Sequence, residues 1–172
     1  MRRFLLVLLA LLAACSTAPT LPTALPALDL PAQLLIRKQT AQDARDMILI
    51  VQQEPAGLRW SLLDPIGMPL ARQLLQDGKW ANDGLVPPNA DAHALFAALL
   101  FAWTSGKDLA SVYPAGTWKQ ESPTRRSLWR DGQKQWDIVY ASSDDGTPMQ
   151  RFTLAAADGP TWHVGPLPGA VP

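Results

Sequence analysis

The chain has 172 residues, of which 15 are basic and 15 acidic, so its formal net charge at pH 7 is zero. This neutrality argues against nucleic acid or another polyanion as the main partner, because such partners select basic surfaces. A single cysteine excludes disulfide bonds within the chain, and seven tryptophans in a chain with only 17% charged residues indicate either an apolar surface held for a ligand or a tryptophan-rich core.

Residues 1–14 are typical of a signal peptide rather than of a folded domain. Two arginines precede an unbroken apolar run over residues 4–12, which is too short to span a bilayer as a stable helix. Residues 12–15, Leu-Ala-Ala-Cys, resemble a bacterial lipobox. This resemblance implies cleavage before Cys15 and lipidation of its thiol, which would give a stable membrane anchor through two acyl chains. By the lipoprotein sorting pattern, Ser16 implies the outer membrane, with the domain in the periplasm.

Residues 15–32 separate the lipidated cysteine from the domain. Four prolines lie between residues 16 and 31. We therefore predict a semi-extended tether with a reach of roughly 3 Å per residue. The folded domain is predicted over residues 33–165 and a flexible tail over residues 166–172.

The first part of the domain has the spacing of an antiparallel meander. Strands are predicted at residues 33–40, 45–53, 57–64 and 68–76. In the third strand every second residue from Leu58 to Leu62 is apolar, so that strand has one apolar face. Residues 47–51 of the second strand are apolar throughout, which predicts a central strand covered on both faces. Asp-Pro-Ile-Gly at residues 64–67 has the chemistry of a type I turn.

One long helix follows a further short strand within residues 80–88. Asn89 or Asp91 can cap a helix over residues 91–104. Its apolar residues cover nearly the whole circumference, which is typical of a helix that is covered on both sides or that faces a cavity or lipid. Strands are predicted again at residues 117–120, 125–131, 136–140, 149–156 and 161–164, with a hairpin turn at Asp131-Gly132. The fold class is α+β, mainly β, with the helix between two β blocks.

Three local patterns resemble the LolA/LolB group of periplasmic lipoprotein carriers and outer-membrane lipoprotein receptors. They are the turn at 64–67 between two strands, the apolar helix 91–104, and the segment 132–140 followed by a strand beginning at Pro148-Met149. The resemblance, nearest to the LolB-type receptor, implies an unclosed antiparallel β barrel with a helical lid and an apolar cavity for acyl chains. A related group comprises uncharacterised lipoproteins of this fold in envelope lipid pathways such as aryl polyene synthesis. The sequence differs from the receptor in two respects: the stretch between the helix and the second β block is shorter, and the Pro-rich tether is longer. These differences argue against the specific task of receiving lipoproteins more than against the fold.

The resemblance and the strand pattern together give candidate ligand-binding residues. We expect the cavity lining to comprise Ile48, Ile50, Trp60, Leu62, Leu95, Leu99 and Trp103. In an ordinary closed domain the same positions would be core, and the sequence leaves this alternative open. The resemblance also assigns Ile66 to a loop that passes cargo to the membrane, the alternative being that it folds back on its own hairpin. The cargo would be acyl chains or a lipoprotein, delivered by a periplasmic carrier protein.

Catalytic motifs are missing from the sequence. It contains no Gly-x-Ser-x-Gly elbow, no metal-ligand spacing and no Gly-rich phosphate loop. His93 and His163 are expected at the surface or its boundary, without a catalytic partner, and Arg125-Arg126 at a solvated strand end. We predict a non-enzymatic lipoprotein without cofactor or metal that binds acyl chains. The alternative is an envelope assembly or structural lipoprotein that binds a protein partner through an exposed strand edge.

Overall fold

The computed structural model describes residues 19–85, 87, 89–141 and 151–169, so Cys15 and the predicted strand start at Pro148-Met149 lie outside it. Within the described residues, ten antiparallel strands form a single unclosed sheet, accompanied by two helices. The strands are β1 (Ala32–Gln39), β2 (Ala44–Glu54), β3 (Gly57–Leu63), β4 (Pro69–Gln76), β5 (Lys79–Asn82), β6 (Trp118–Ser122), β7 (Arg125–Arg130), β8 (Gln133–Tyr140), β9 (Phe152–Ala156) and β10 (Thr161–Pro166). The helices are α2 (Ala90–Trp103) and α3 (Leu109–Val112).

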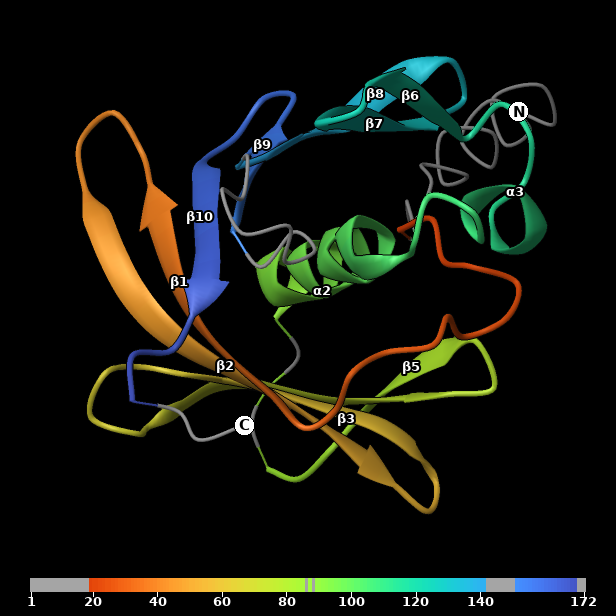
Figure 1. Ribbon diagram of the computed structural model, residues 1–172. Coiled ribbons are helices and arrows are strands. Elements are labelled where there is room, and N and C mark those ends of the chain that lie inside the picture. Colours follow the sequence, from red (N-terminus) through yellow and green to blue (C-terminus); the bar gives the residue numbers. More distant parts are fainter. Residues whose placement is uncertain (1–18, 86, 88, 142–150, 170–172) are drawn as a thin grey trace, which may run out of the picture.

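The sheet consists of two meanders joined through their first and last strands. Its order is β5-β4-β3-β2-β1-β10-β9-β8-β7-β6, and β1 pairs with β10 in a register that sets Ile36 opposite Val164. The sheet curves around α2, which lies on its concave side (Figure 1). This mainly β half-barrel with a helix inserted between two β blocks confirms the predicted fold class.

The predicted elements coincide closely with the observed ones because turn residues mark their ends. Asn89 is the cap of α2, since its Oδ1 accepts a hydrogen bond from the Ala92 N–H at 3.1 Å. Asp131 and Gly132 both have positive φ, as a two-residue hairpin turn of the predicted kind requires. Two features differ from the prediction: the short helix α3 was expected as a loop, and β10 continues to Pro166.

The β2–β3 hairpin determines which residues of these two central strands face the same side of the sheet. A two-residue turn places Glu54 opposite Gly57, and the register then brings Val51 opposite Trp60. Gly57 is required here, because a Cβ at this position would collide with the Leu75 carbonyl oxygen of β4. The apolar face of β3 therefore fixes which face of β2 turns inward.

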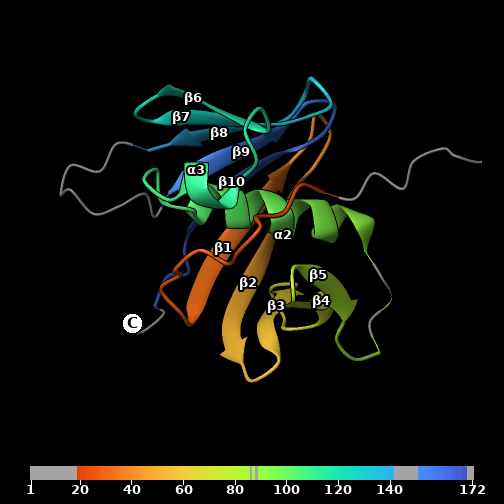
Figure 2. The ribbon, with the colours of Figure 1, turned by 90° about the vertical axis from the view of Figure 1, so that its right-hand side faces the viewer.

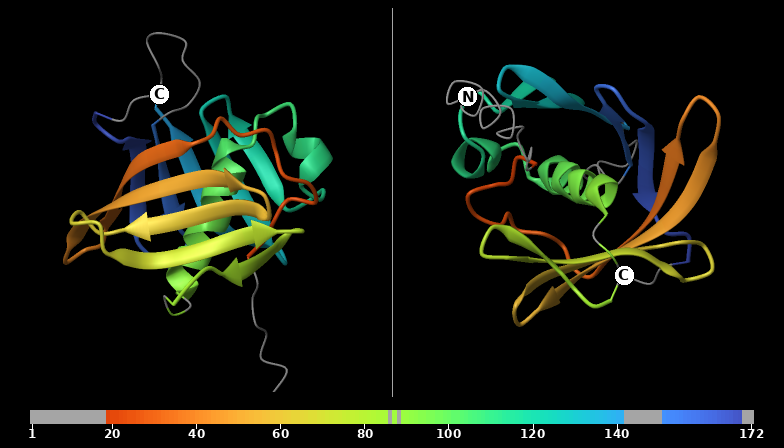
Figure 3. Two further views of the ribbon diagram at one scale, coloured as in Figure 1. Left: turned by 90° about the horizontal axis from the view of Figure 1, so that it is seen from below. Right: turned by 180° about the vertical axis from the view of Figure 1, so that it is seen from behind.

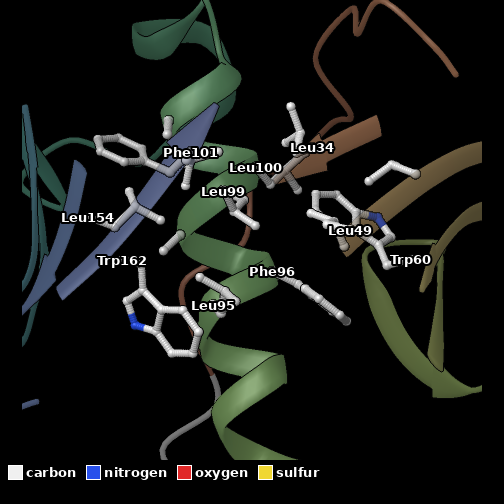
Figure 4. Close-up of a cluster of buried hydrophobic side chains, with 14 of the residues drawn as sticks. Leu34, Leu49, Trp60, Leu95, Phe96, Leu99, Leu100, Phe101, Leu154 and Trp162 are labelled. Carbon is white, nitrogen blue, oxygen red and sulfur yellow. The ribbon is translucent and has the colours of Figure 1, made fainter. Parts of the chain in front are cut away.

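The core consists of α2 and the residues that surround it. The buried residues of α2 are Ala92, Leu95, Phe96, Ala97, Ala98, Leu99, Leu100, Phe101 and Ala102. Figure 4 shows Trp60 on one side of this helix and Leu154 and Trp162 on the other. Because the sheet wraps around it, α2 has no solvated stripe, as its all-round apolar sequence predicts.

Residues 19–31 lie on the domain instead of extending freely from it, which differs from the predicted tether. The N–H and the hydroxyl of Thr23 both donate to the Val112 carbonyl of α3, at 2.7 and 3.1 Å. Further along, a small hollow is lined by residues 21–25 together with Leu75 and Gly78 from the β4–β5 end of the sheet. We call residues 19–31 the N-terminal strap. Seen from the open side, the strap passes in front of α2 (Figure 2).

Both ends of the described chain contribute to the domain. Prolines 22 and 26 of the strap are buried, and its leucines 21, 28 and 30 pack against the core. At the other end, the Leu167 N–H donates to the Gln33 carbonyl at 3.1 Å, beyond the predicted domain end at residue 165. No helix in the described ranges is both long and apolar enough to cross a membrane.

Candidate functional site

The concave side of the sheet brings together five of the seven candidate lining residues. Trp60 and Leu62 of β3 point inward and are 0% and 3% exposed, and Leu95 and Leu99 of α2 are fully buried in the same core cluster. Trp103 is partly buried and stacks on Trp60 with 5.5 Å between ring centroids. These residues are packed into one buried cluster with the rest of the core, so a ligand that takes their place on the concave side would displace part of α2.

Ile48 and Ile50 do not belong to this interior, and their assignment as lining residues is wrong. The burial pattern of β2 alternates, with Met47, Leu49 and Val51 buried and the two isoleucines only half-buried on the convex face. Because residues 47–51 are apolar throughout, their pattern does not indicate which of them face the interior. The two-residue hairpin loop provides this information, because it fixes the register between β2 and β3 and so determines which residues of β2 share the inward face of β3.

An aromatic cluster joins β3 and β5 to α2. The Trp60 ring lies 5.3 Å from Phe96 and 5.7 Å from Trp80, measured between ring centroids. Trp80 in turn contacts Phe96 at 5.9 Å and His93 at 5.5 Å. Such pairs contribute about 0.5–1.5 kcal/mol each beyond the area they bury. Trp80 was not among the candidates, although it lies within the short strand that the sequence predicts.

Four buried polar atoms in this region have no hydrogen-bond partner among the described residues. They are Trp60 Nε1, Gln73 Oε1, Trp80 Nε1 and His93 Nε2. We call these four residues the seam cluster, because they line the contact between β3–β5 and α2. Burial also lowers the pKa of His93. The boundary position predicted for His93 is therefore correct, but its Nε2 is turned away from solvent.

The C-terminal end of α2 is held by buried hydrogen bonds from β7 and β8. Arg126 Nη1 donates to the Thr104 carbonyl at 2.7 Å, and the Tyr140 hydroxyl donates to the Ala102 carbonyl at 2.7 Å. These two donors form what we call the C-terminal anchor. Burial raises the pKa of Tyr140, so its hydroxyl stays protonated and available as a donor.

Arg126 was predicted at a solvated strand end, and the structure corrects this prediction. Its side chain is 1% exposed and lies 4.8 Å from the centre of the Tyr140 ring. Its neighbour Arg125 is exposed, as predicted, and pairs with Asp137 at 2.7 Å. The two-residue period of a strand carries the signal, since Leu128 is a buried apolar residue and Arg126 lies two residues before it, on the same face of β7.

The N-terminal end of α2 is held more weakly than the C-terminal end. Besides the Asn89 cap, its first turn has a single ion pair to the sheet among the described residues, from Lys38 Nζ to Asp91 Oδ2 at 3.5 Å, with Asp91 largely exposed. Exposed pairs of this kind contribute little to stability. The N-terminal half of α2 is therefore held to the sheet mainly by the aromatic cluster, with few polar contacts.

The loop between β3 and β4 presents an exposed apolar tip. Asp64 fixes its shape, because its carboxylate accepts hydrogen bonds from the N–H groups of Ile66 and Met68, at 3.0 and 2.8 Å. Ile66 is 85% exposed and Met68 59% exposed. Ile66 therefore does not fold back on its hairpin. In Figure 3, seen from below, this yellow loop projects from the end of the sheet.

The described residues contain no cluster of three or more His, Cys, Asp or Glu side chains that could hold a metal ion. His163 is exposed on β10, with Thr153 Oγ1 3.5 Å from its Nδ1.

Comparison with known proteins places the chain in a family. The family described as "Protein of unknown function (DUF3261)" matches residues 31–157, from the start of β1 to the end of β9. The chain belongs to this family. The match leaves out most of the N-terminal strap and β10.

One curated relative carries the name of an enzyme. A protein of Pseudomonas fluorescens named "Phosphoribosyl-AMP cyclohydrolase 2" is 28% identical over 122 residues, which cover 69% of this chain and 76% of the relative. At this identity the name does not transfer an activity to the present chain.

Proposed function

We propose that this protein is an outer-membrane lipoprotein, anchored through Cys15, that carries or receives acyl chains on the concave side of its half-barrel, in the manner of the LolA/LolB group. The observation that supports this best is the way the interior is filled. A single helix, apolar on all sides, occupies the concave face of an unclosed sheet. One element can therefore leave the interior without breaking the strand pairing of the sheet.

Replacement of α2 by an acyl chain is physically reasonable. The contacts between α2 and the sheet are mainly apolar and non-directional, and a hydrocarbon chain gains roughly 0.8 kcal/mol for each buried methylene. An acyl chain can offset the lost contacts of the helix as it enters. Binding of this kind needs shape and apolar area rather than a catalytic group.

Two further features fit exchange with a membrane. The tip formed by Ile66 and Met68 offers apolar side chains to lipid, and the strap that covers the open side of the half-barrel follows Cys15 in the sequence. A carrier at the outer membrane would receive its cargo from a periplasmic carrier protein and release it at this tip. The cargo would be an acylated lipoprotein or an envelope lipid such as an aryl polyene.

The proposal is tested by titrating the mature, delipidated protein with a fluorescent fatty acyl probe. Saturable binding with one probe per protein is the expected result, and unlabelled palmitate should displace the probe. A well-folded protein that binds no probe would contradict the proposal. That result would favour a lipoprotein that binds a protein partner at the edge strands β5 or β6.

A further inference from the structure

The seam cluster brings four side chains, each with a buried polar atom that has no partner among the described residues, to the contact between β3–β5 and α2. Gln73 of β4 lies directly opposite Trp60 of β3, and both side chains face α2. Trp80 of β5 lies opposite Leu75, two residues along from Gln73 and on the same inward face. The Trp80 ring is 5.7 Å from that of Trp60 and 5.5 Å from that of His93. Three strands and the helix thus each contribute one member.

These atoms differ in their hydrogen bonding from two donors at the other end of α2, Arg126 Nη1 and the Tyr140 hydroxyl. Trp60 and Gln73 are 0% and 3% exposed, and neither Trp60 Nε1 nor Gln73 Oε1 has a partner among the described residues. Buried polar groups in native proteins are nearly always paired, and an unpaired one costs free energy. Arg126 and Tyr140, by contrast, donate to carbonyl groups at the end of α2. A helix that pivots about this C-terminal anchor would move His93, in its first turn, away from Trp80 before it uncovers Trp60, which also stacks on Trp103 at the C-terminal end of α2.

We propose that the seam cluster is a binding site for the ester carbonyl of an acyl ligand, whose hydrocarbon chain occupies the space left by the N-terminal half of α2. The two indole N–H groups donate to the carbonyl oxygen, and the Gln73 amide and the His93 imidazole complete the polar surroundings. This inference rests on the proposed function. The proposed function concerns only the hydrocarbon chain of the ligand, and the inference adds a binding site for its polar head group.

The chemistry of the four side chains favours a neutral acceptor over a carboxylate. None of the four carries a fixed positive charge, and the lowered pKa of His93 keeps its imidazole neutral. A carboxylate buried here would lack a compensating cation, which is costly in an apolar site. An ester carbonyl needs only donors, and the indole N–H groups of Trp60 and Trp80 supply two.

The experiment compares three ligands of equal chain length by displacement of a fluorescent acyl probe from the mature protein. The ligands are methyl laurate, laurate and dodecane, which share the chain and differ in the head. We expect methyl laurate to displace the probe at the lowest concentration. Trp80→Phe keeps an aromatic ring but removes the N–H, and it should reduce the preference for the ester over dodecane about fivefold, as expected for one hydrogen bond.

Trp162→Phe is the matched control for Trp80→Phe. Trp162 is also a buried tryptophan whose Nε1 has no partner among the described residues, but it lies on β10, on the other side of α2 from Trp60 (Figure 4). It should leave the ester preference unchanged. If it reduces this preference as strongly as Trp80→Phe, or if Trp80→Phe weakens dodecane and ester equally, the proposed site is wrong.

Gln73→Met gives a second test that does not depend on ligand. Because Gln73 Oε1 has no partner within the described structure, replacing the amide by a thioether of similar size should hold or raise the Tm. A clear fall in Tm would show that the amide is satisfied in the closed protein and would overturn the assignment. Equal binding of all three ligands would refute the ester site while leaving the acyl-carrier function standing, whereas failure of the parent probe to bind would refute the function itself.

Discussion

Replacement of Ile66 by serine should weaken the contact of the domain with lipid. The side chain is 85% exposed, so nearly all of its apolar surface is still available for burial. Full burial of an isoleucine side chain is worth roughly 1.5–3 kcal/mol, and 85% of this is about 1.3–2.5 kcal/mol, which corresponds to roughly a ten- to sixtyfold change in partitioning. The Asp64 hydrogen bonds that shape the loop involve main-chain N–H groups and are retained in the variant.

The assay is flotation of the mature domain, lacking its acyl chains, with phospholipid vesicles. Val139→Ser is the matched control, because Val139 is an exposed apolar residue of β8, at 44% exposure, outside the β3–β4 loop. The partition coefficient of Ile66→Ser should be roughly ten- to sixtyfold lower than that of the parent, and that of Val139→Ser about equal to it. Equal flotation of parent and Ile66→Ser, or an equal loss in both variants, would refute the idea that this loop inserts into lipid.

Three further predictions concern α2 and the strap. Tyr140→Phe leaves the Ala102 carbonyl without its buried donor, so it should lower the free energy of unfolding in urea by about 1–3 kcal/mol. An unchanged free energy of unfolding would show that this hydrogen bond does not hold the C-terminal end of α2. Thr23→Pro removes both donors to the Val112 carbonyl and should raise the association rate of the acyl probe several-fold in stopped-flow measurements, whereas an unchanged rate would show that the strap does not limit access. Burial lowers the pKa of His93, so the closed form is favoured fully above roughly pH 6.5 and loses this advantage as the pH falls below it. Probe association should therefore quicken on acidification in the parent but not in His93→Asn, and identical pH profiles would contradict this role.

The elements of this fold could be predicted because local chemistry marks them. The turn at residues 64–67 and the Asn89 cap are specified by a few neighbouring side chains, and the observed bounds follow them closely. The inward face of β3 was predictable because apolar and polar residues alternate between Leu58 and Leu62. These signals are local, so one sequence suffices to detect them.

The features that the sequence did not yield depend on contacts between distant segments. Arg126 forms its hydrogen bond to a carbonyl 22 residues away, and Thr23 donates to a carbonyl 89 residues away. A proline-rich segment such as the strap has no periodicity that would indicate docking. For Ile48 and Ile50 the uniformly apolar sequence of the strand does not show which residues face inward. The register of the β2–β3 hairpin determines this, and the two-residue turn that sets the register is itself a local feature.

In the proposed function, α2 must leave the concave face before an acyl chain can bind. This can be tested by replacing Lys38 and Asp91, which form the ion pair between β1 and the first turn of α2, with cysteines and bridging the two thiols with a short bifunctional reagent. The matched control bridges Arg37 and Asp46, which are cross-strand partners on β1 and β2 and do not involve α2. The measurement is the affinity for the fluorescent acyl probe before and after bridging. We expect that bridging Lys38→Cys/Asp91→Cys abolishes saturable binding while the bridged control keeps it. Unchanged binding by the bridged α2 variant would show that α2 need not move.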